Sequence, residues 1–202
     1  MPPLGLTLLI GGARSGKSTL ALSLARASTL EVVFIATAEA LDDDMAARIA
    51  RHRAERPPTW TTIEEPHDLS AALAAAPSDA FVIVDCLTLW LTNRLLASVV
   101  GDASDDGAAA TALGVTASED VVEHETPVAI AAALARTGPT IVVTNEVGLG
   151  VVPPHPLGRT FRDALGRVNA AWAAAAERSL FLVAGRALAL VDPLALLGDR
   201  DD

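Results

Sequence analysis

The residue types best suited to chemistry form one glycine-rich stretch near the N-terminus. Gly11-Gly12-Ala13-Arg14-Ser15-Gly16-Lys17-Ser18 has the pattern G-x-x-x-x-G-K-S, with an apolar run before it and helix-forming residues after it. Glycines allow backbone N–H groups to turn inward around a phosphate, and the start of a helix adds the positive end of its dipole. Lys17, the only lysine in the chain, can place a compact charge on the outer phosphates, and the Ser18 hydroxyl can bind Mg²⁺. The stretch therefore predicts a phosphate-binding P-loop that works with magnesium.

Three carboxylates lie at or just beyond the ends of predicted strands. Asp85 follows four apolar residues, an arrangement that can hold Mg²⁺ directly or through water. The same position also suits an N-cap for a helix beginning near Leu87, but beside a P-loop we favour the metal role. Glu146 is either a general base or nucleotide contact, or a solvated loop carboxylate, and both interpretations stay open. Glu64 ends a short strand.

His52 lies near the end of a helix predicted from Asp44 to Arg53. Met45, Ile49 and His52 share one face of this helix by their spacing. A neutral imidazole has a free nitrogen that can attack phosphorus, and neighbouring arginines can stabilise the phosphate. The arginines that flank His52 are Arg48, Arg51, Arg53 and Arg56. From these residues alone, a structural histidine that contacts the helix-terminal carbonyls is the favoured interpretation.

Strand-like and helix-like runs alternate along the chain, which predicts right-handed βαβ units in a mostly parallel sheet. Open sheets of this kind bind ligands at the carboxyl ends of their strands, where Thr37-Ala38-Glu39 follows a predicted strand. The expected strands cover residues 7–10, 31–36, 60–64, 81–85, 140–144, 180–184 and 187–191. The expected helices cover residues 17–27, 44–53, 68–75, 87–98, 121–135 and 158–176. We expect a single α/β domain over residues 1–202.

Composition excludes several classes of protein. The net charge is −10, and no basic or aromatic stretch offers a surface for nucleic acid. No apolar run is long enough and free enough of charge to span a bilayer. A single cysteine, Cys86, leaves no intramolecular disulfide and fits a reducing compartment. We therefore expect a cytoplasmic protein.

Two further segments have unusual compositions. Residues 101–120 are rich in Gly, Ala, Ser, Thr and Asp, and we expect a mobile surface insertion there. The predicted helix 158–176 is rich in alanine but carries a group of polar residues. That group indicates either a functional or intersubunit face or ordinary surface charge; its members are Arg159, Arg162, Asp163, Arg167 and Asn169.

Several separate motifs, taken together, resemble one enzyme family. Beside the P-loop, they are Ile35-Ala36-Thr37, residues 41–49 (LDDDMAARI), His52, Arg56-Pro57, residues 143–153 (VTNEVGLGVVP) and residues 161–169 (FRDALGRVN). In this order they resemble the bifunctional adenosylcobinamide kinase / adenosylcobinamide-phosphate guanylyltransferases of adenosylcobalamin biosynthesis. The resemblance runs from about residue 8 to about residue 185.

The resemblance implies a three-layer, RecA-like P-loop NTPase fold and two reactions. A nucleoside triphosphate, ATP or GTP, phosphorylates the aminopropanol hydroxyl of adenosylcobinamide. GTP then donates GMP to a histidine, and the phosphorylated corrinoid takes up the GMP to give adenosylcobinamide-GDP. The family's nucleophile falls on His52, which reverses the interpretation from the residues alone. The family can also assemble as a trimer, so a homotrimer is expected.

The resemblance also assigns a set of site residues. The metal ligands would be Ser18 and Asp85. The nucleotide contacts would be Gly11, Gly12, Ala13, Arg14, Ser15, Gly16, Lys17, Ser18, Thr37, Ala38, Glu39, Arg53, Ala54, Glu55, Arg56, Glu64 and Asp85. Some relatives have two adjacent histidines at the nucleophile, whereas here the first is Arg51, so only His52 can serve. Some also have Glu where this chain has the shorter Asp85.

The sequence leaves two alternative functions open, and each would give a different result with nucleotides. A monofunctional P-loop kinase for another small alcohol would turn over ATP but form no covalent GMP adduct. A nucleotide-binding regulatory protein would bind GTP without releasing pyrophosphate on its own.

Overall fold

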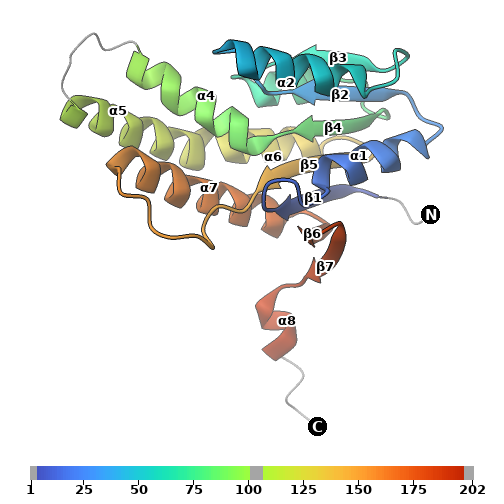
Figure 1. Cartoon of the computed structure of the whole chain (residues 1–202). Coiled ribbons are helices and arrows are strands. Elements are labelled where there is room, and N and C mark those ends of the chain that lie inside the picture. The colour runs from blue at the N-terminus through green and yellow to red at the C-terminus, as the bar shows by residue number, and fades with distance from the viewer. Residues whose placement is uncertain (1–3, 101–106, 198–202) are drawn as a thin grey trace.

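A seven-stranded sheet forms the centre of the molecule (Figure 1). The computed structural model describes residues 4–100 and 107–197. The strands are β1 (Leu6–Gly11), β2 (Val32–Ala36), β3 (Thr61–Glu64), β4 (Phe81–Asp85), β5 (Thr140–Asn145), β6 (Arg178–Val183) and β7 (Arg186–Leu190). Their order across the sheet is β3-β2-β4-β5-β1-β6-β7, and all neighbours are parallel except the antiparallel pair β6–β7. The predicted mostly parallel sheet is confirmed.

Helices cover both faces of this sheet. They are α1 (Lys17–Arg26), α2 (Asp43–Ala54), α3 (Leu69–Ala75), α4 (Leu87–Val100), α5 (Gly107–Asp120), a π-helical turn η1 (Val121–Glu125), α6 (Thr126–Leu134), α7 (Pro156–Ala175) and α8 (Pro193–Leu197). Side chains alternate along a strand, so Val82 and Val84 of β4 pack with α3, α4, α6 and α7, whereas Phe81 and Ile83 pack with α1. The predicted three-layer α/β architecture is therefore confirmed.

The expectation of a mobile insertion at 101–120 is wrong for residues 107–120. These residues form helix α5, which packs against α4 and α7 (Figure 1); residues 101–106 lie outside the described residues. Glycine, serine and threonine are typical of loops, but small side chains also let helices approach closely. A Cβ added to Gly114 would lie 2.6 Å from Cδ1 of Leu157, so the Leu157 side chain would have to move to admit a larger residue.

The predicted helix 121–135 begins with a π-helical turn, because Pro127 cannot donate a backbone hydrogen bond.

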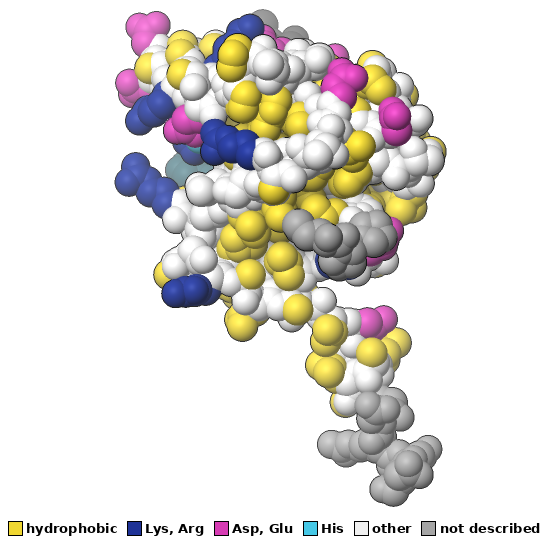
Figure 2. Space-filling view, turned by 90° about the vertical axis from the view of Figure 1, so that its right-hand side faces the viewer, with side chains coloured by type: hydrophobic (Ala, Val, Ile, Leu, Met, Phe, Trp, Pro, Cys, Tyr) yellow, Lys and Arg dark blue, Asp and Glu magenta, His cyan; other side chains and the backbone are white. Residues whose placement is uncertain are grey.

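The C-terminal segment extends away from the body of the molecule (Figures 1 and 2). All five residues of β7 are exposed, and so is α8, which the sequence did not predict. The exposed apolar side chains of this C-terminal arm are Leu188, Leu190, Val191, Leu194, Leu196 and Leu197. The tail at 198–202, where fraying is expected, lies outside the described residues. Within the described part of the chain, no helix is long and apolar enough to cross a membrane.

Candidate nucleotide-binding site

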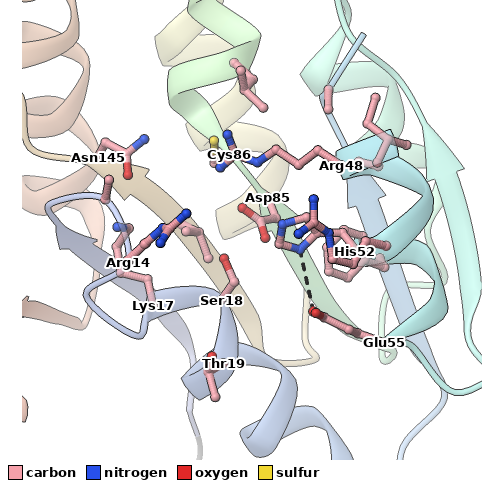
Figure 3. Close-up of a pocket in the computed structure, with 18 of the residues that line it drawn as sticks. Arg14, Lys17, Ser18, Thr19, Arg48, His52, Glu55, Asp85, Cys86 and Asn145 are labelled. Atoms are coloured by element: carbon pink, nitrogen blue, oxygen red, sulfur yellow. Dashed lines mark ion pairs between the residues drawn. The ribbon is translucent and has the colours of Figure 1, made fainter. Parts of the chain in front are cut away.

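A cleft of about 760 Å³ opens at the carboxyl edge of the sheet (Figure 3). The loop after β1 and the start of α1 form one side of it, through residues 13–19. Helix α2 forms the opposite side, where His52 faces the cleft, and Asp85 from β4 lies between the two sides. Arg56, two residues beyond the end of α2, also lines the cleft. Residues far apart in the sequence meet here because parallel strands end at one edge.

The P-loop is held tightly around its lysine. Lys17 is 6% exposed, and its Nζ donates hydrogen bonds to the carbonyls of Gly11 (2.9 Å) and Gly12 (2.7 Å). Burial lowers the pKa of Lys17 from its usual value, while the charge of Asp85 opposes this shift. Gly16, which precedes α1, has a φ of 103°, a conformation that glycine adopts without strain.

The turn between β6 and β7 contacts the P-loop and stabilises it. The N–H of Gly185, whose φ is 73°, donates to the carbonyl of Ser15 (3.0 Å). A Cβ at Gly11 would lie 2.3 Å from the carbonyl oxygen of Leu182, so the loop approaches β6 too closely for any other residue. The P-loop conformation therefore depends on the strand that leads into the C-terminal arm.

Asp85 faces the P-loop, and the alternative N-cap role belongs to its neighbour. The side chains of Ser18 and Asp85 both line the cleft and lie near each other in Figure 3. Burial raises the pKa of Asp85, and the Ser18 side chain and the charges of Arg56 and Lys17 oppose that rise. Cys86 directly precedes α4, and its carbonyl accepts the N–H of Trp90 (3.1 Å), so Cys86 and not Asp85 is in the N-cap position of this helix. The pair Ser18–Asp85 offers two hard oxygen ligands side by side, which is the donor chemistry that Mg²⁺ prefers.

Helix α2 presents His52 to the cleft. The side chain of Asp42 caps the helix by accepting from the Met45 N–H (2.7 Å). Met45, Ile49 and His52 all line the cleft, so the predicted common face is confirmed. Nδ1 of His52 lies 3.6 Å from Oε2 of Glu55, and the imidazole is 42% exposed. With Nδ1 on the Glu55 side, Nε2 is the nitrogen left for another partner.

Arg56 is positioned by an aromatic ring. Its guanidinium stacks over Phe34 of β2, 3.6 Å from the ring centroid, and Nη1 donates to Oγ1 of Thr62 (3.4 Å). Both contacts fix a positive charge at the α2 side of the cleft.

Several residues assigned by resemblance lie outside the lining of this cleft. Thr37 is fully buried, and its hydroxyl bonds both the carbonyl and the N–H of Cys86 at 2.7 Å. Glu39 lies 3.9 Å from His67, and Arg53 pairs with Glu64 at 3.0 Å. Gly11, Gly12 and Ala54 are likewise not among the lining residues, whereas Ala13 to Ser18, Ala38, Glu55, Arg56 and Asp85 are.

Asn145, at the end of β5, is a cleft residue to which sequence reasoning gave no role. The sequence contains a signal for this residue, because a polar side chain follows the predicted strand 140–144 at the edge where such sheets bind ligands. The carboxylate of Glu146 instead accepts the N–H of Gly148 within its own loop.

Of the polar group on α7, Asn169 donates to the Asn145 carbonyl at 3.0 Å and so supports the site. The remaining members bond elsewhere: Arg159 to the carbonyls of Pro153 and Pro154, Arg162 to Asp163, and Arg167 to Glu123.

The G-x-x-x-x-G-K-S loop lies between a buried parallel strand and a helix, and it faces a carboxylate at the end of another strand. These features define the molecule as a P-loop nucleotide-binding protein of the α/β class.

Comparison with known proteins identifies the family. Residues 7–190 match the family described as cobinamide kinase / cobinamide phosphate guanyltransferase, and the chain belongs to that family.

Curated relatives agree with this assignment. The chain is 44% identical over 179 residues to the bifunctional adenosylcobalamin biosynthesis protein CobP of Pseudomonas aeruginosa, covering 88% of this chain and 92% of the relative. It is 41% identical over 180 residues to the bifunctional adenosylcobalamin biosynthesis protein CobU of Salmonella typhimurium, and equally to that of Escherichia coli; each match covers 88% of this chain and 95% of the relative. The predicted family and enzyme class are confirmed.

Proposed function

We propose that this chain phosphorylates adenosylcobinamide and then transfers GMP from GTP to adenosylcobinamide phosphate, through a guanylylated His52. The observation that carries the proposal is that the P-loop and His52 line the same cleft from opposite sides (Figure 3). A triphosphate anchored by Lys17 can therefore present its α-phosphorus to the histidine. GTP serves the second reaction, and ATP or GTP serves the first.

The guanylyl transfer divides one difficult exchange into two displacements. Nε2 of His52 forms a bond to the α-phosphorus, and the bond to the bridging oxygen breaks, so that pyrophosphate leaves with the electron pair. Lys17 and the N–H groups of the P-loop hold that pyrophosphate. A phosphate oxygen of adenosylcobinamide phosphate then attacks the same phosphorus and releases His52, which gives adenosylcobinamide-GDP. Arg56, fixed over Phe34, neutralises charge that develops on the α-phosphate.

We infer that Mg²⁺ accompanies the nucleotide. Ser18 and Asp85 would hold it, directly or through water, because their oxygens already lie together in the cleft. When bound, the ion would neutralise negative charge on the phosphates. Two protein ligands suffice, because Mg²⁺ keeps several waters and takes further ligands from substrate phosphates.

We also propose that the chain assembles as a homotrimer through its C-terminal arm. The arm exposes apolar side chains on both strand and helix; Leu188 is 67% exposed and Leu194 is 73% exposed. Because β7 is the edge strand of the sheet that the described residues form, a second copy of the chain can pair with its outer side. Leu188→Glu with Leu194→Glu should lower the mass measured by light scattering to that of a monomer. Leu134→Glu, at an exposed apolar position on α6, is the control and should leave the mass unchanged; a trimer in the double variant would contradict the arm as the interface.

Labelling with GTP that carries ³²P at the α-phosphate tests the central step. The wild-type chain should acquire acid-labile label and release pyrophosphate without a partner. His52→Asn should abolish the label and leave phosphorylation of adenosylcobinamide largely intact. Lys17→Ala should impair both reactions.

His124→Asn provides the matched control, because His124 is exposed and, in the described part of the chain, its one ion pair is with Asp120, four residues before it. It should label like the wild type. Label retained in His52→Asn would refute His52 as the nucleophile, and unchanged labelling in Lys17→Ala would confine the P-loop to the kinase step.

A further inference from the structure

The polar end of β5 occupies a distinctive place in the cleft. β5 lies between β4, which carries Asp85, and β1, which carries the P-loop. In the register of the sheet, Asn145 lies opposite Gly11, the first residue of the P-loop. Its half-buried side chain lines the cleft on the side of Arg14 and Lys17, across from His52 (Figure 3).

A buried polar network fixes the backbone of this residue on both sides. The N–H of Asn145 donates to Oγ1 of Thr88 on α4 (2.9 Å), and its carbonyl accepts from Nδ2 of Asn169 on α7 (3.0 Å). Oδ1 of Asn169 in turn accepts from the hydroxyl of Thr144 (2.7 Å). Thr88, Thr144 and Asn169 are all at least nine-tenths buried.

This network determines where the amide of Asn145 can point. The bonds to Asn145 all use its main chain. Among the described residues, no hydrogen bond occupies its side-chain amide, so that amide is available to a ligand in the cleft. A neutral amide donates hydrogen bonds to phosphate oxygens, and a rigidly held donor costs little reorganisation during a reaction.

From this placement, we propose that Asn145 contacts the terminal phosphate of the bound triphosphate and serves the kinase step, not the guanylyl transfer. The inference rests on the proposed function. It assigns the kinase reaction to the P-loop end of the cleft and the guanylyl transfer to the α2 end. At the P-loop end, the acceptor hydroxyl oxygen forms a bond to the γ-phosphorus. The bond from that phosphorus to the bridging oxygen breaks with its electron pair going to the nucleoside diphosphate, and the hydroxyl proton passes to water. At the α2 end, His52 attacks the α-phosphorus.

Separate assays of the two reactions test this division. Asn145→Ala should lower kcat for phosphorylation of adenosylcobinamide by about 100-fold, the usual effect of removing one positioned donor. Labelling of His52 by α-labelled GTP should stay within about threefold of wild type, since pyrophosphate still has Lys17. Asn145→Asp, which keeps the shape but adds a negative charge beside the γ-phosphate, should lower the kinase rate further. An unchanged kinase rate, or equal losses in both reactions, would overturn the assignment.

Glu146→Gln is the matched control, because Glu146 is the adjacent residue and its carboxylate binds the Gly148 N–H of its own loop. It should keep both rates. A loss of kinase activity in this variant equal to that of Asn145→Ala would assign the effect to the loop and overturn the role of the amide.

A binding measurement keeps the test independent of turnover. In calorimetry, the wild-type chain should bind a non-hydrolysable GTP analogue more tightly than GDP, and Asn145→Ala should reduce this preference about tenfold. An unchanged preference would refute contact with the terminal phosphate, even in a chain that catalyses neither reaction. Absence of both activities in the wild type would instead refute the proposed function, so the two failures remain distinguishable.

Discussion

The charge of Asp85 opposes folding, and its removal is expected to stabilise the protein while inactivating it. Burial raises the pKa of this carboxyl, so its charged form is less favourable in the folded chain than in the unfolded chain. Asp85→Asn keeps the size of the side chain and an oxygen for the Ser18 hydroxyl. Because Asp85 retains partial exposure to the cleft, we set the gain near the low end for such substitutions, about 1 kcal/mol at pH 7. For a chain of this length, that raises Tm by about 2–4 °C.

The pH dependence of this gain has a definite sign. With the folded pKa above the unfolded value of 3.8, the folded chain binds more protons between the two values. The wild-type protein therefore loses stability as pH rises through this window, and the loss is complete above the folded pKa. The Asn variant lacks that loss, so the two proteins should converge in stability below pH 3.8 and separate above it.

Denaturant unfolding at several pH values, together with assays of both reactions, measures these effects. The variant should be more stable at pH 7 and lose at least about 100-fold in each reaction, since a ligand for Mg²⁺ is gone. Asp68→Asn is a control of opposite sign: hydrogen bonds from Ser70 and Ala71 lower the pKa of Asp68, so its charge favours the fold at pH 7. A less stable Asp85→Asn protein at pH 7, or a gain that persists unchanged at low pH, would refute the reasoning.

Two further predictions concern residues around the P-loop. Burial raises the pKa of the Cys86 thiol to about 12, so iodoacetamide at pH 8 should alkylate the native chain at under about 1% of the rate of a free thiol; rapid native alkylation, measured by mass spectrometry, would contradict this. Gly185→Val places a β-branched side chain at a φ of 73°, which should cost about 1–3 kcal/mol and lower Tm by several degrees. An unchanged melting curve would show that the turn relaxes instead.

The sequence predicted best what is encoded locally. Strand, P-loop and helix follow one another within residues 6–26, so the glycine spacing and apolar periodicity together specify β1, the loop and α1. The shared face of Met45, Ile49 and His52 also followed from helical spacing alone. The end of α2 and the ends of most strands fell within one or two residues of those expected.

What the sequence could not predict depends on topology or on close packing. Asn145 reaches the cleft only because β5 lies between β4 and β1, and no local pattern states the order of strands. Helix α5 was missed because Gly114 and its small neighbours resemble a loop, although the same residues allow contact with Leu157. Thr37 is a residue type that can bind a nucleotide, and it follows a strand at the ligand-binding edge. Its hydroxyl is instead hydrogen-bonded to the backbone carbonyl and N–H of Cys86.

The two sides of the cleft differ in how firmly the fold holds them, and this decides which variants report on chemistry alone. None of the residues of α2 is buried, so His52→Asn should change the free energy of unfolding by less than about 0.5 kcal/mol. Lys17 is buried and bonds two backbone carbonyls, so Lys17→Ala should cost about 1–3 kcal/mol.

Thermal melts of both variants beside the wild type check this difference. If His52→Asn destabilised the chain as much as Lys17→Ala, loss of guanylylation in it could no longer be attributed to a missing nucleophile. If His52→Asn has the same Tm as the wild type, the absence of label in this variant is direct evidence that His52 is the nucleophile.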